Sequence, residues 1–591
     1  MPITYKRPGT YVEEVGVPQR VAAQNFDVAI GAFVGATERG RTDQAVLVQS
    51  WSDFTKLFGG FKGSNASSLA LPNAVYQFFS NNGRACYVKR VVGDGASAAS
   101  ILLVDTNATE ILEVSAISAG AWSIPTANGS GLYIYVENTT PSIEVDEWSL
   151  EDLTVVVTTL TPHNFAVGDS VYVYGVDSAV NGQHLVTAID GLNFSYTVLS
   201  GSNDSGSGSG TVSPNPETFS LSVYYNGTST GNLVERYTDL TMSPSSDRYA
   251  ISVVNTSSNW IALTDDPEVN IDFLAPVSSL TPQSLTGGSD GDAIIPSDLN
   301  ASSTAFDVIQ QNLLFNIPDS AYMSQSDHLT VMNHYIGAVE DRSDSFLIVD
   351  TPLSAESASD ATSFATYLTP KSANAAVYFP WVKVADPASG FAGTLKTMPA
   401  GGSVAGYVLT NDSVNGVYKA PAGVGAQLRN VIATATNLTS SNLDDLNTAT
   451  YPVNAIRPIP GSGLCIMGAR TISTDRNSRY VNTRRTLLQI KKRLADLTAF
   501  AVFESNNVLL WDKVRTVCTI YLNELWQAGG LKGISATSAF YVTCDDTNNT
   551  AESVAEGILN IEVGVALQTP AEFVVIKIGQ FDGSTSVSIQ E

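Results

Sequence analysis

The sequence predicts a multidomain α+β protein, with α/β core domains, a large β-rich insertion of sandwich or barrel type, and extended terminal arms. Three observations lead to this fold class. The chain has 591 residues, too many for one hydrophobic core, which indicates roughly three or four domains. Helical and strand-like apolar patterns mix up to about residue 100 and again from about 293. The stretch between them, 101–292, carries short alternating runs separated by turns, which is typical of β structure.

The first segment, residues 1–20, is predicted to form an N-terminal arm. Pro2, Pro8 and Pro18 punctuate a short strand-like run, and prolines confine such a segment to a sheet edge or an extended arm. The candidate strand residues of this arm are Thr10, Tyr11, Val12, Glu13 and Val15.

The segments 21–100 and 293–460 are predicted to form one α/β middle domain, which the β-rich region interrupts. One of its short helices begins at a Ser cap and ends at Gly59-Gly60, as helices commonly do. Continuous apolar runs between the helices predict buried strands. The expected helices are 52–58 and 71–79, and the expected strands are 28–34, 46–48, 85–92, 346–350 and 375–384.

The β-rich insertion, 101–292, has few charges and many Ser, Thr and Gly residues, and its regularly spaced strands predict a sandwich or barrel that faces outward. Residues 148–213 are predicted to form a small β-barrel nested within it, which contains His163 and His184. The Gly/Ser tract 201–210 indicates a flexible linker at the end of this barrel.

The last folded segment, 461–570, is predicted to form a C-terminal α/β domain. Apolar residues at helical spacing predict one helix over about 476–500 and a second from about 506 to 529. A strand is expected at 540–544. The run 558–568 alternates apolar and polar residues, which indicates a half-buried strand. Its apolar face consists of Leu559, Ile561, Val563, Val565 and Leu567.

The chain ends in residues 571–591, which are predicted to form a C-terminal strand arm. Alternation places Val574, Ile576 and Ile578 on one face of that strand. The candidate strand residues of this arm are Phe573, Val574, Val575, Ile576 and Ile578.

Composition narrows the function classes. Lys and Arg number 31 against 57 Asp and Glu, so the formal net charge is -26, which repels phosphate backbones and predicts no nucleic-acid partner. The four cysteines are dispersed, which favours neither a zinc cluster nor a disulfide framework and suits a reducing cytoplasm. The N-terminus lacks an apolar signal region, and no run of about 18 apolar residues occurs, so we expect neither export nor membrane insertion.

Catalytic motifs are not expected either. The sequence contains no HExxH or Walker A pattern and only four histidines. Gly287 to Gly291 matches the GxSxG pattern, but a nucleophile at Ser289 would need a preceding buried strand and a following helix, and neither is predicted. Asp290 and Asp292 lack the other ligands of a calcium loop. We therefore assign no catalytic, metal or cofactor residue and expect no cofactor.

A basic window stands out against the acidic chain. Residues 470–493 hold 8 of the 31 basic residues, with Asp475 as the only acid. One interpretation is a solvated helix face with local salt bridges; the other is a surface that docks on an acidic partner, since complementary charge orients such contacts. The residues of the candidate docking surface are Arg476, Arg479, Arg484, Arg485, Lys491, Lys492 and Arg493.

Longer motifs resemble one family. Over about 2–100 and 293–580 the chain is collinear with the contractile phage tail sheath proteins, whereas 101–292 matches less well. The motifs that carry this resemblance are PGTYVEEV, AIGAFVGATERG, LVQSWSDFTKLFGGF, YQFFSNNGRACYVKRV, VYFPWVKVADPASG, MPAGGSVAG, GVYKAPAG, IRPIPGSGLCIMGARTIS, SRYVNTRRTLLQIKKRL, AVFESNN, TCDDTNNT and PAEFVVIKI.

The resemblance implies a structural subunit that forms stacked hexameric rings around an inner tail tube protein. It also implies baseplate and tail terminator proteins as further partners. It implies a C-terminal domain next to the tube and location in a virion tail assembled in the host cytoplasm. It also implies that both arms add strands to the C-terminal sheets of neighbours. The acceptor strand would then be the one that carries Leu559, Ile561, Val563 and Val565.

The resemblance further implies contraction without nucleotide, with the basic window facing the tube through weak, releasable contacts. A phage-derived bacteriocin or an extracellular contractile injection system is an alternative of the same mechanical class. The acidic, Ser/Thr-rich β region also allows a cell-surface adhesin or S-layer protein, against which the missing signal peptide argues.

Overall fold

The computed structural model describes residues 29–61, 70–105, 108–126, 129–139, 142–208, 210–215, 217–265, 274–386 and 393–572. The strand residues predicted for the two terminal arms, 10–15 and 573–578, lie outside these described residues.

The body of the protein is built on one eight-stranded sheet in the order β2-β3-β1-β19-β20-β21-β25-β26. The six inner strands are parallel, and the edge strands β2 and β26 run antiparallel to their neighbours. Ile30 lies opposite Leu313, so residues on either side of the β-rich region form a single sheet. The strands are β1 (Ile30–Gly35), β2 (Val46–Val48), β3 (Cys86–Arg90), β19 (Leu313–Asn316), β20 (Phe346–Asp350), β21 (Ala375–Phe379), β25 (Val453–Ile459) and β26 (Gly463–Ile466).

Helices cover both faces of this sheet, which explains why its inner strands are mostly apolar. On one face lie α1 (Trp51–Phe58), α2 (Ala70–Ser80) and α7 (Gly401–Asn415). On the other lie α4 (Pro296–Ala301), α5 (Gln325–Arg342), α6 (Ala358–Tyr367) and α8 (Ser440–Thr448). Gly402 and Gly406 allow α7 to approach α2 closely, because a Cβ at either position would meet the α2 backbone.

Two details of this body differ from the sequence prediction. The cap of α1 is Ser50 rather than Ser52, since Ser50 Oγ accepts a hydrogen bond from Asp53 N at 3.1 Å. The run predicted as one strand over 375–384 is two strands in different sheets, because the chain turns at Pro380, which has no N–H to continue a ladder. The second strand, β22 (Val382–Ala385), pairs with β23 (Leu395–Met398) and β24 (Ala433–Thr434).

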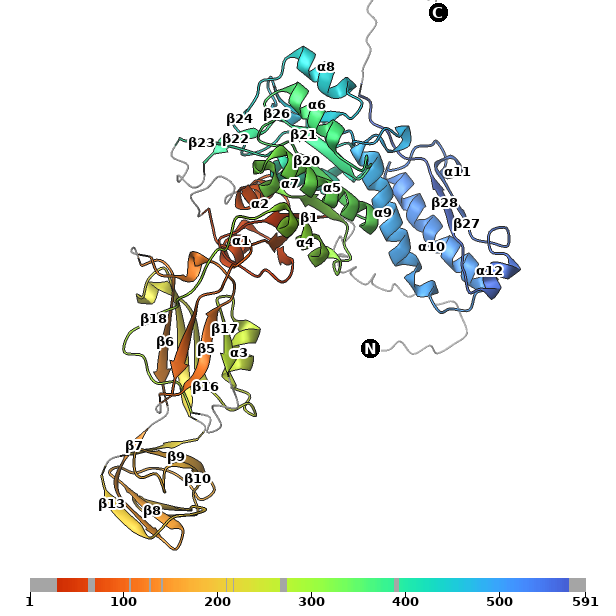
Figure 1. Cartoon of the computed structure of the whole chain (residues 1–591). Helices are drawn as coiled ribbons and strands as arrows, with labels where there is room; N and C mark the ends of the chain where they lie inside the picture. The colour runs from red at the N-terminus through yellow and green to blue at the C-terminus, as the bar shows by residue number, and fades with distance from the viewer. Residues whose placement is uncertain are drawn as a thin grey trace, which may run out of the picture.

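The β-rich region projects from the body as a sandwich with its own core (Figure 1). One sheet has the order β16-β15-β6-β18 and the other the order β17-β5-β4, with α3 (Ala250–Ser257) packed beside them. The strands are β4 (Ser100–Val104), β5 (Glu110–Ala116), β6 (Leu132–Asn138), β15 (Thr218–Tyr225), β16 (Leu233–Thr241), β17 (Ile261–Asp265) and β18 (Gln283–Ser284).

A second all-β unit occupies the far tip of the projection (Figure 1). It has a separate core, to which Phe165, Phe194 and Tyr196 contribute, and its strands form one sheet in the order β10-β9-β14-β7-β8-β12-β11, with β13 also paired to β7. The strands are β7 (Ile143–Glu151), β8 (Thr154–Thr159), β9 (Ser170–Tyr174), β10 (Gly182–Leu185), β11 (Ala188–Asp190), β12 (Asn193–Thr197), β13 (Asp204–Ser207) and β14 (Thr211–Pro214).

The expectation of a flexible linker over 201–210 is wrong for its central part. Residues Asp204–Ser207 form β13 and pair with β7, Asp204 opposite Leu150 and Ser207 opposite Glu147. Gly and Ser are poor strand formers by themselves, but a ladder uses backbone groups, and the neighbouring strand supplies the partners.

The body and the β-rich region meet at a cluster around Arg39. Its guanidinium lies 4.0 Å from the ring centroid of Trp260 and 4.9 Å from that of Tyr225, both in the β-rich region. The same group donates hydrogen bonds of 3.0 Å to the carbonyl oxygens of Thr55 and Lys56 at the end of α1. Arg39 therefore joins the two regions through cation–π contacts and hydrogen bonds.

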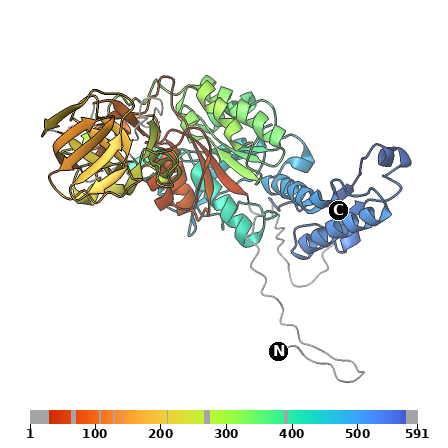
Figure 2. The same ribbon diagram turned by 90° about the horizontal axis from the view of Figure 1, so that it is seen from below.

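The C-terminal region lies on the side of the body opposite to the β-rich region (Figures 1 and 2). Two long antiparallel helices pack against a two-stranded sheet, as the sequence predicts in outline. The predicted helix over 476–500 begins later, at Val481, because Arg476–Ser478 form a separate 3-10 turn. The elements are α9 (Val481–Thr498), α10 (Val508–Gln527), α11 (Ala536–Ala539), α12 (Ala551–Ala555), β27 (Phe540–Thr543) and β28 (Glu562–Val565).

Candidate functional site

The two-stranded sheet of the C-terminal region has a free edge on each side among the described residues. β27 and β28 are antiparallel, with Phe540 opposite Val565 and Thr543 opposite Glu562. A sheet of only two strands is marginal alone, and an unpaired strand edge offers backbone donors and acceptors to another chain. The geometry of this sheet is therefore suited to the addition of strands.

The inner face of this sheet is anchored on the helices. Leu559 and Ile561 contact a cluster with Trp511, Val514 and Cys518 of α10. Val563 and Val565 contact the adjoining cluster, to which α9 contributes Ile490. The four residues predicted for the acceptor strand thus share one half-buried face, which leaves the strand edges rather than this face available to a partner.

The regular strand is shorter than predicted. Only Glu562–Val565 of the run 558–568 form β28. Before it, side chains replace the ladder: Asn549 accepts a hydrogen bond from Asn560 N at 2.6 Å and donates one to Asn560 O at 3.0 Å. Asn548 in the same turn donates to Thr543 O at 2.8 Å. The TCDDTNNT motif therefore closes the loop between β27 and β28.

The basic window divides into interior and surface residues. Arg485 is an interior residue: its side chain is 5% exposed and forms an ion pair with Asp412 of α7, whose side chain is 1% exposed. Burial raises the pKa of Asp412, and the charge of Arg485 opposes that shift. The prediction that Arg485 belongs to an exposed docking surface is wrong, because a buried and paired guanidinium cannot reach a partner. Arg484 is half-buried and donates to Asn374 Oδ1 at 2.7 Å.

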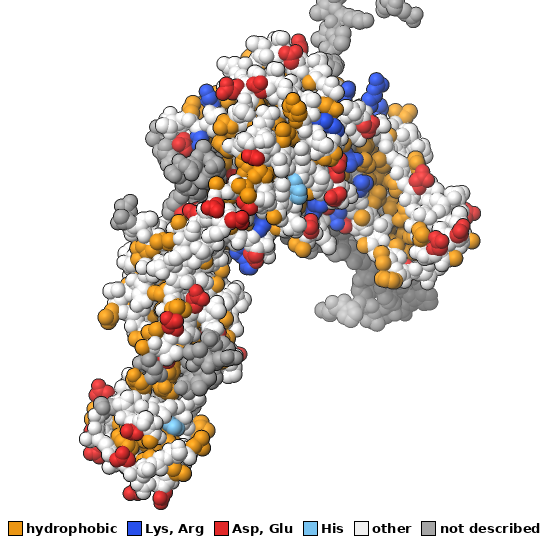
Figure 3. Space-filling model, in the orientation of Figure 1, with side chains coloured by type: hydrophobic (Ala, Val, Ile, Leu, Met, Phe, Trp, Pro, Cys, Tyr) orange, Lys and Arg blue, Asp and Glu red, His pale blue; other side chains and the backbone are white. Residues whose placement is uncertain are grey.

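The remaining basic residues reach the surface. Arg476, Arg479 and Lys491 are exposed, whereas Lys492 is half-buried and pairs with Asp496 at 2.8 Å, one helical turn away. Figure 3 shows Lys and Arg side chains gathered over α9 beside a hydrophobic strip of the C-terminal region. Local pairing is therefore confirmed for Lys492, and Arg476, Arg479 and Lys491 are open to solvent; docking on an acidic partner stays a prediction.

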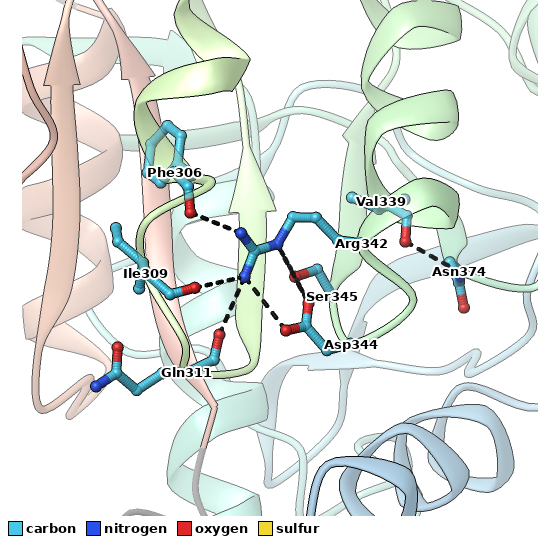
Figure 4. Close-up of polar contacts among 8 residues, drawn as sticks. All are labelled: Phe306, Ile309, Gln311, Val339, Arg342, Asp344, Ser345 and Asn374. Atoms are coloured by element: carbon cyan, nitrogen blue, oxygen red, sulfur yellow. Dashed lines mark hydrogen bonds and ion pairs between the residues drawn. The ribbon is translucent and has the colours of Figure 1, made fainter. Parts of the chain in front are cut away.

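A polar cleft of ≈ 300 Å³ runs between α9 and the loop that precedes β19. Its lining includes Gln310, Gln311, Gln489, Lys492 and Arg493. The wall opposite α9 is held in place by Arg342 at the end of α5 (Figure 4).

The guanidinium of Arg342 determines the position of that loop. It donates to Phe306 O at 2.6 Å, to Ile309 O at 2.9 Å and to Gln311 O at 3.4 Å (Figure 4). Asp344 accepts a hydrogen bond from its Nε at 3.2 Å. Because every donor group is engaged within the fold, Arg342 is a structural residue that shapes the cleft and is not a ligand group.

The C-terminal end of the described chain is tied to the body. Glu572 Oε1 accepts a hydrogen bond from Arg470 Nε at 2.8 Å. Its Oε2 accepts hydrogen bonds from Arg470 Nη2 and, at 3.2 Å, from Tyr480 OH. Hydrogen bonding by Glu572 raises the pKa of Arg470. Sequence reasoning counted Arg470 in the basic window and missed Glu572, because a partner 102 residues away leaves no local signal.

The carboxyl ends of the parallel strands, where α/β sheets usually bind ligands, are filled by the protein's own groups. Asp319 is buried, accepts hydrogen bonds from Ala36 N and, at 2.9 Å, from Leu71 N, and burial raises its pKa to about 7. Asp350, the last residue of β20, is also buried and accepts a hydrogen bond from Gly401 N at 2.7 Å; burial raises its pKa to about 6. These carboxylates cap α2 and α7.

The rejected catalytic motif is a turn in the structure. Ser289 bridges Ser97, each N–H donating to the other's carbonyl oxygen at 3.0 Å, and its hydroxyl accepts a hydrogen bond from Gly291 N. Within the described ranges, no three His, Cys, Asp or Glu side chains are grouped as metal ligands. A search of the described helices finds none with the length and apolar character to cross a membrane.

The fold is similar to those of solved sheath proteins. The chain is similar to the helical sheath of the anti-feeding prophage in its contracted state, with a TM-score of 0.51 at 18% identity over 98% of this chain and 100% of that one. It is also similar to a sheath tail protein from Listeria innocua, with a TM-score of 0.53 at 12% identity over 88% and 92% of the two chains. The fold is that of contractile sheath subunits.

Sequence comparison finds the same family resemblance over part of the chain. Residues 473–580 match the phage tail sheath C-terminal domain. The tail sheath protein of Vibrio phage KVP40 is 27% identical over 155 residues, and that of Enterobacteria phage T4 is 28% identical over 156. Each match covers 26% of this chain and spans 22% of the relative's length. The resemblance to the contractile tail sheath family, a family of structural proteins, is confirmed.

Proposed function

We propose that this protein is the structural subunit of a contractile tail sheath, which polymerises as stacked hexameric rings around an inner tube and contracts, without nucleotide, to drive the tube through a host envelope. The observation that carries the proposal is the two-stranded sheet β27–β28, whose edges are free among the described residues. A second chain can add strands there through main-chain hydrogen bonds.

The donors in this proposal are the arms 1–20 and 571–591, with the strand residues named for each. Side chains of the arm, such as Tyr11 and Val12 or Val574 and Ile576, would set the register. The subunits assemble in a metastable extended tube, and new contacts between subunits supply the free energy of contraction. The arm strands stay paired while their linkers take up the rotation.

The surface residues Arg476, Arg479 and Lys491, with the cleft that Lys492 and Arg493 line, form the proposed tube-facing surface. Exposed ion pairs are worth only about 0–1 kcal/mol each, so a contact of this kind holds the tube but releases it during contraction. An acidic partner surface fits the charge of this region.

The proposed partners are further copies of the chain, the inner tail tube protein, and baseplate and tail terminator proteins, with assembly in the host cytoplasm and a final place in the virion tail. We assign the chain no enzymatic activity and no nucleic-acid or membrane binding. The nested barrel 148–213 favours a phage over a bacteriocin or an extracellular injection system, because it enlarges the outer surface without contributing to the body's sheet.

Electron microscopy of the purified protein tests the proposal. We expect tubes or stacked rings, and monodisperse monomers under all conditions would contradict it. Deletion of residues 1–17 should leave a folded monomer that forms no tubes, since the donated strand is lost. The matched control is deletion of the tip unit β7–β14, residues 143–214, which contains the predicted barrel 148–213, has a separate core and should leave tube formation intact.

A further inference from the structure

The contact at Glu572 is stronger than an ordinary surface ion pair. Arg470 binds both carboxylate oxygens, and Tyr480 donates a third hydrogen bond at 3.2 Å. The side chains of Arg470 and Glu572 are 9% and 21% exposed. Two parallel N–H donors on one carboxylate fix its direction as well as its position, and partial burial strengthens the attraction.

Arg470 is itself fixed in the body. Its backbone N–H donates to Asn454 Oδ1 at 2.7 Å, and Asn454 Nδ2 donates to Arg470 O at 2.8 Å. Asn454 belongs to β25 of the eight-stranded sheet. The guanidinium also donates to Asn447 O at 2.8 Å, in the last turn of α8. A force applied to Glu572 therefore passes through Arg470 into the body of the protein.

The alternative route for such a force is weak. Between β28 and Glu572 the chain is held by single uncharged hydrogen bonds. Gln568 O accepts them from Asn482 Nδ2 at 3.3 Å and Thr483 Oγ1 at 3.0 Å, and Gln568 Nε2 donates to Leu531 O at 3.1 Å. Ala566 N donates to Ala539 O at 2.8 Å, and Ala566 O accepts from Lys532 N at 2.7 Å. Next along the chain come the four residues of β28, paired to β27. A pull on the end of β28 would act on its hydrogen bonds one after another and open the sheet.

From this arrangement we infer that the contact of Glu572 with Arg470 and Tyr480 is a tension clamp, which transfers a pull on the C-terminal arm to the eight-stranded sheet and keeps it away from β27–β28. The inference rests on the proposed function, in which that arm is bound to a neighbour while the lattice moves. Each subunit would accept strands at β27–β28 and donate the strand of its own C-terminal arm. The clamp keeps a pull on that arm from opening β27–β28.

Single-molecule stretching of the full-length monomer tests the clamp without requiring tubes. Handles are fused before residue 1 and after residue 591, and the lifetime of the folded C-terminal region is measured at constant force. Glu572→Gln retains the shape of the side chain and loses its charge, so the lifetime should fall about tenfold, the effect of one charge-assisted hydrogen bond. Tyr480→Phe, which removes one hydrogen bond, should give a smaller decrease.

The control is Asp512→Asn on α10, which removes an exposed ion pair with Arg515 in the same region and should leave the lifetime unchanged. Equal lifetimes for wild type, Glu572→Gln and Tyr480→Phe would overturn the inference. Circular dichroism without force checks that Glu572→Gln folds. If it does not fold, the lifetimes of Tyr480→Phe and wild type are compared instead, and equal values would overturn the inference. The proposed function has a separate test: failure of the wild-type protein to form tubes would refute it. The stretching of monomers does not depend on tube formation, so the two failures can be told apart.

Discussion

Arg485 of α9 and Asp412 of α7 form a buried ion pair, with Arg485 Nη1 2.9 Å from Asp412 Oδ1. Both side chains are almost fully enclosed. The pair joins the C-terminal region to the helix that packs on the main sheet, so the start of α9 is part of the body while its later turns support β27 and β28.

Breaking this pair should destabilise the protein. Arg485→Met leaves the carboxylate of Asp412 buried without its partner, and we expect the free energy of unfolding to fall by about 3–5 kcal/mol. The double variant Arg485→Met with Asp412→Leu should recover much of the loss, because no unpaired charge remains. Urea denaturation of the three proteins measures the effect. A double variant no more stable than the single one would contradict the interpretation.

Asp319 should make stability depend on pH. Its folded pKa of about 7 exceeds the unfolded value of 3.8, so the folded state binds more protons between these values. Stability from this group is therefore greatest below about pH 4 and is lost as pH rises toward 7, by at most about 1.4 kcal/mol per pH unit. The difference in unfolding free energy between wild type and Asp319→Asn should show that decline, followed by a plateau.

Subtracting the unfolding free energy of Asp319→Asn from that of wild type removes the contributions of other titrating groups. His328, whose pKa burial lowers to about 4, changes stability in the opposite direction, and Asp350 changes it in the same direction as Asp319. Both are present in the two proteins and cancel in the difference. A flat difference from about pH 4 to 8 would show that Asp319 does not titrate as described.

Arg39 should hold the β-rich region in a fixed orientation. Arg39→Ala removes the cation–π contacts with Trp260 and Tyr225 and two hydrogen bonds to the end of α1. Such contacts are worth about 2 kcal/mol when desolvated, so the junction should loosen without unfolding either region. Small-angle scattering should show a broader range of shapes. Arg41→Ala, which breaks only an exposed pair with Asp43, is the control and should scatter as wild type does.

The basic surface should affect tube binding and leave lattice formation intact. Arg479→Glu with Lys491→Glu reverses two exposed charges, and we expect sheath tubes to form but to cosediment with the inner tube several-fold less well. Raising the salt concentration should weaken the wild-type contact in the same way. Arg515→Glu on the exposed side of α10 is the matched control. Unchanged cosedimentation of the double variant would remove α9 from the tube interface.

Much of the fold could be predicted because its signals are local. Strands such as Phe346–Asp350 are apolar runs, and α9 and α10 follow helical spacing between polar turns. The alternation of Leu559 to Val565 was sufficient to predict which face of the acceptor strand is buried. These features depend on residues a few positions apart, so their spacing can be read directly from the sequence.

The sequence by itself therefore determined which segments are helices or strands and that the β-rich region interrupts one α/β domain. Its collinear motifs also determined the resemblance to tail sheath proteins. Only the tertiary structure decided that Arg485 is interior, that Glu572 binds Arg470, and that the Gly/Ser tract at 204–207 is a strand. The reason is physical: an ion pair or a ladder depends on which groups meet in space. These partners lie 73 and 102 residues apart for the two ion pairs, and no local pattern records such a distance.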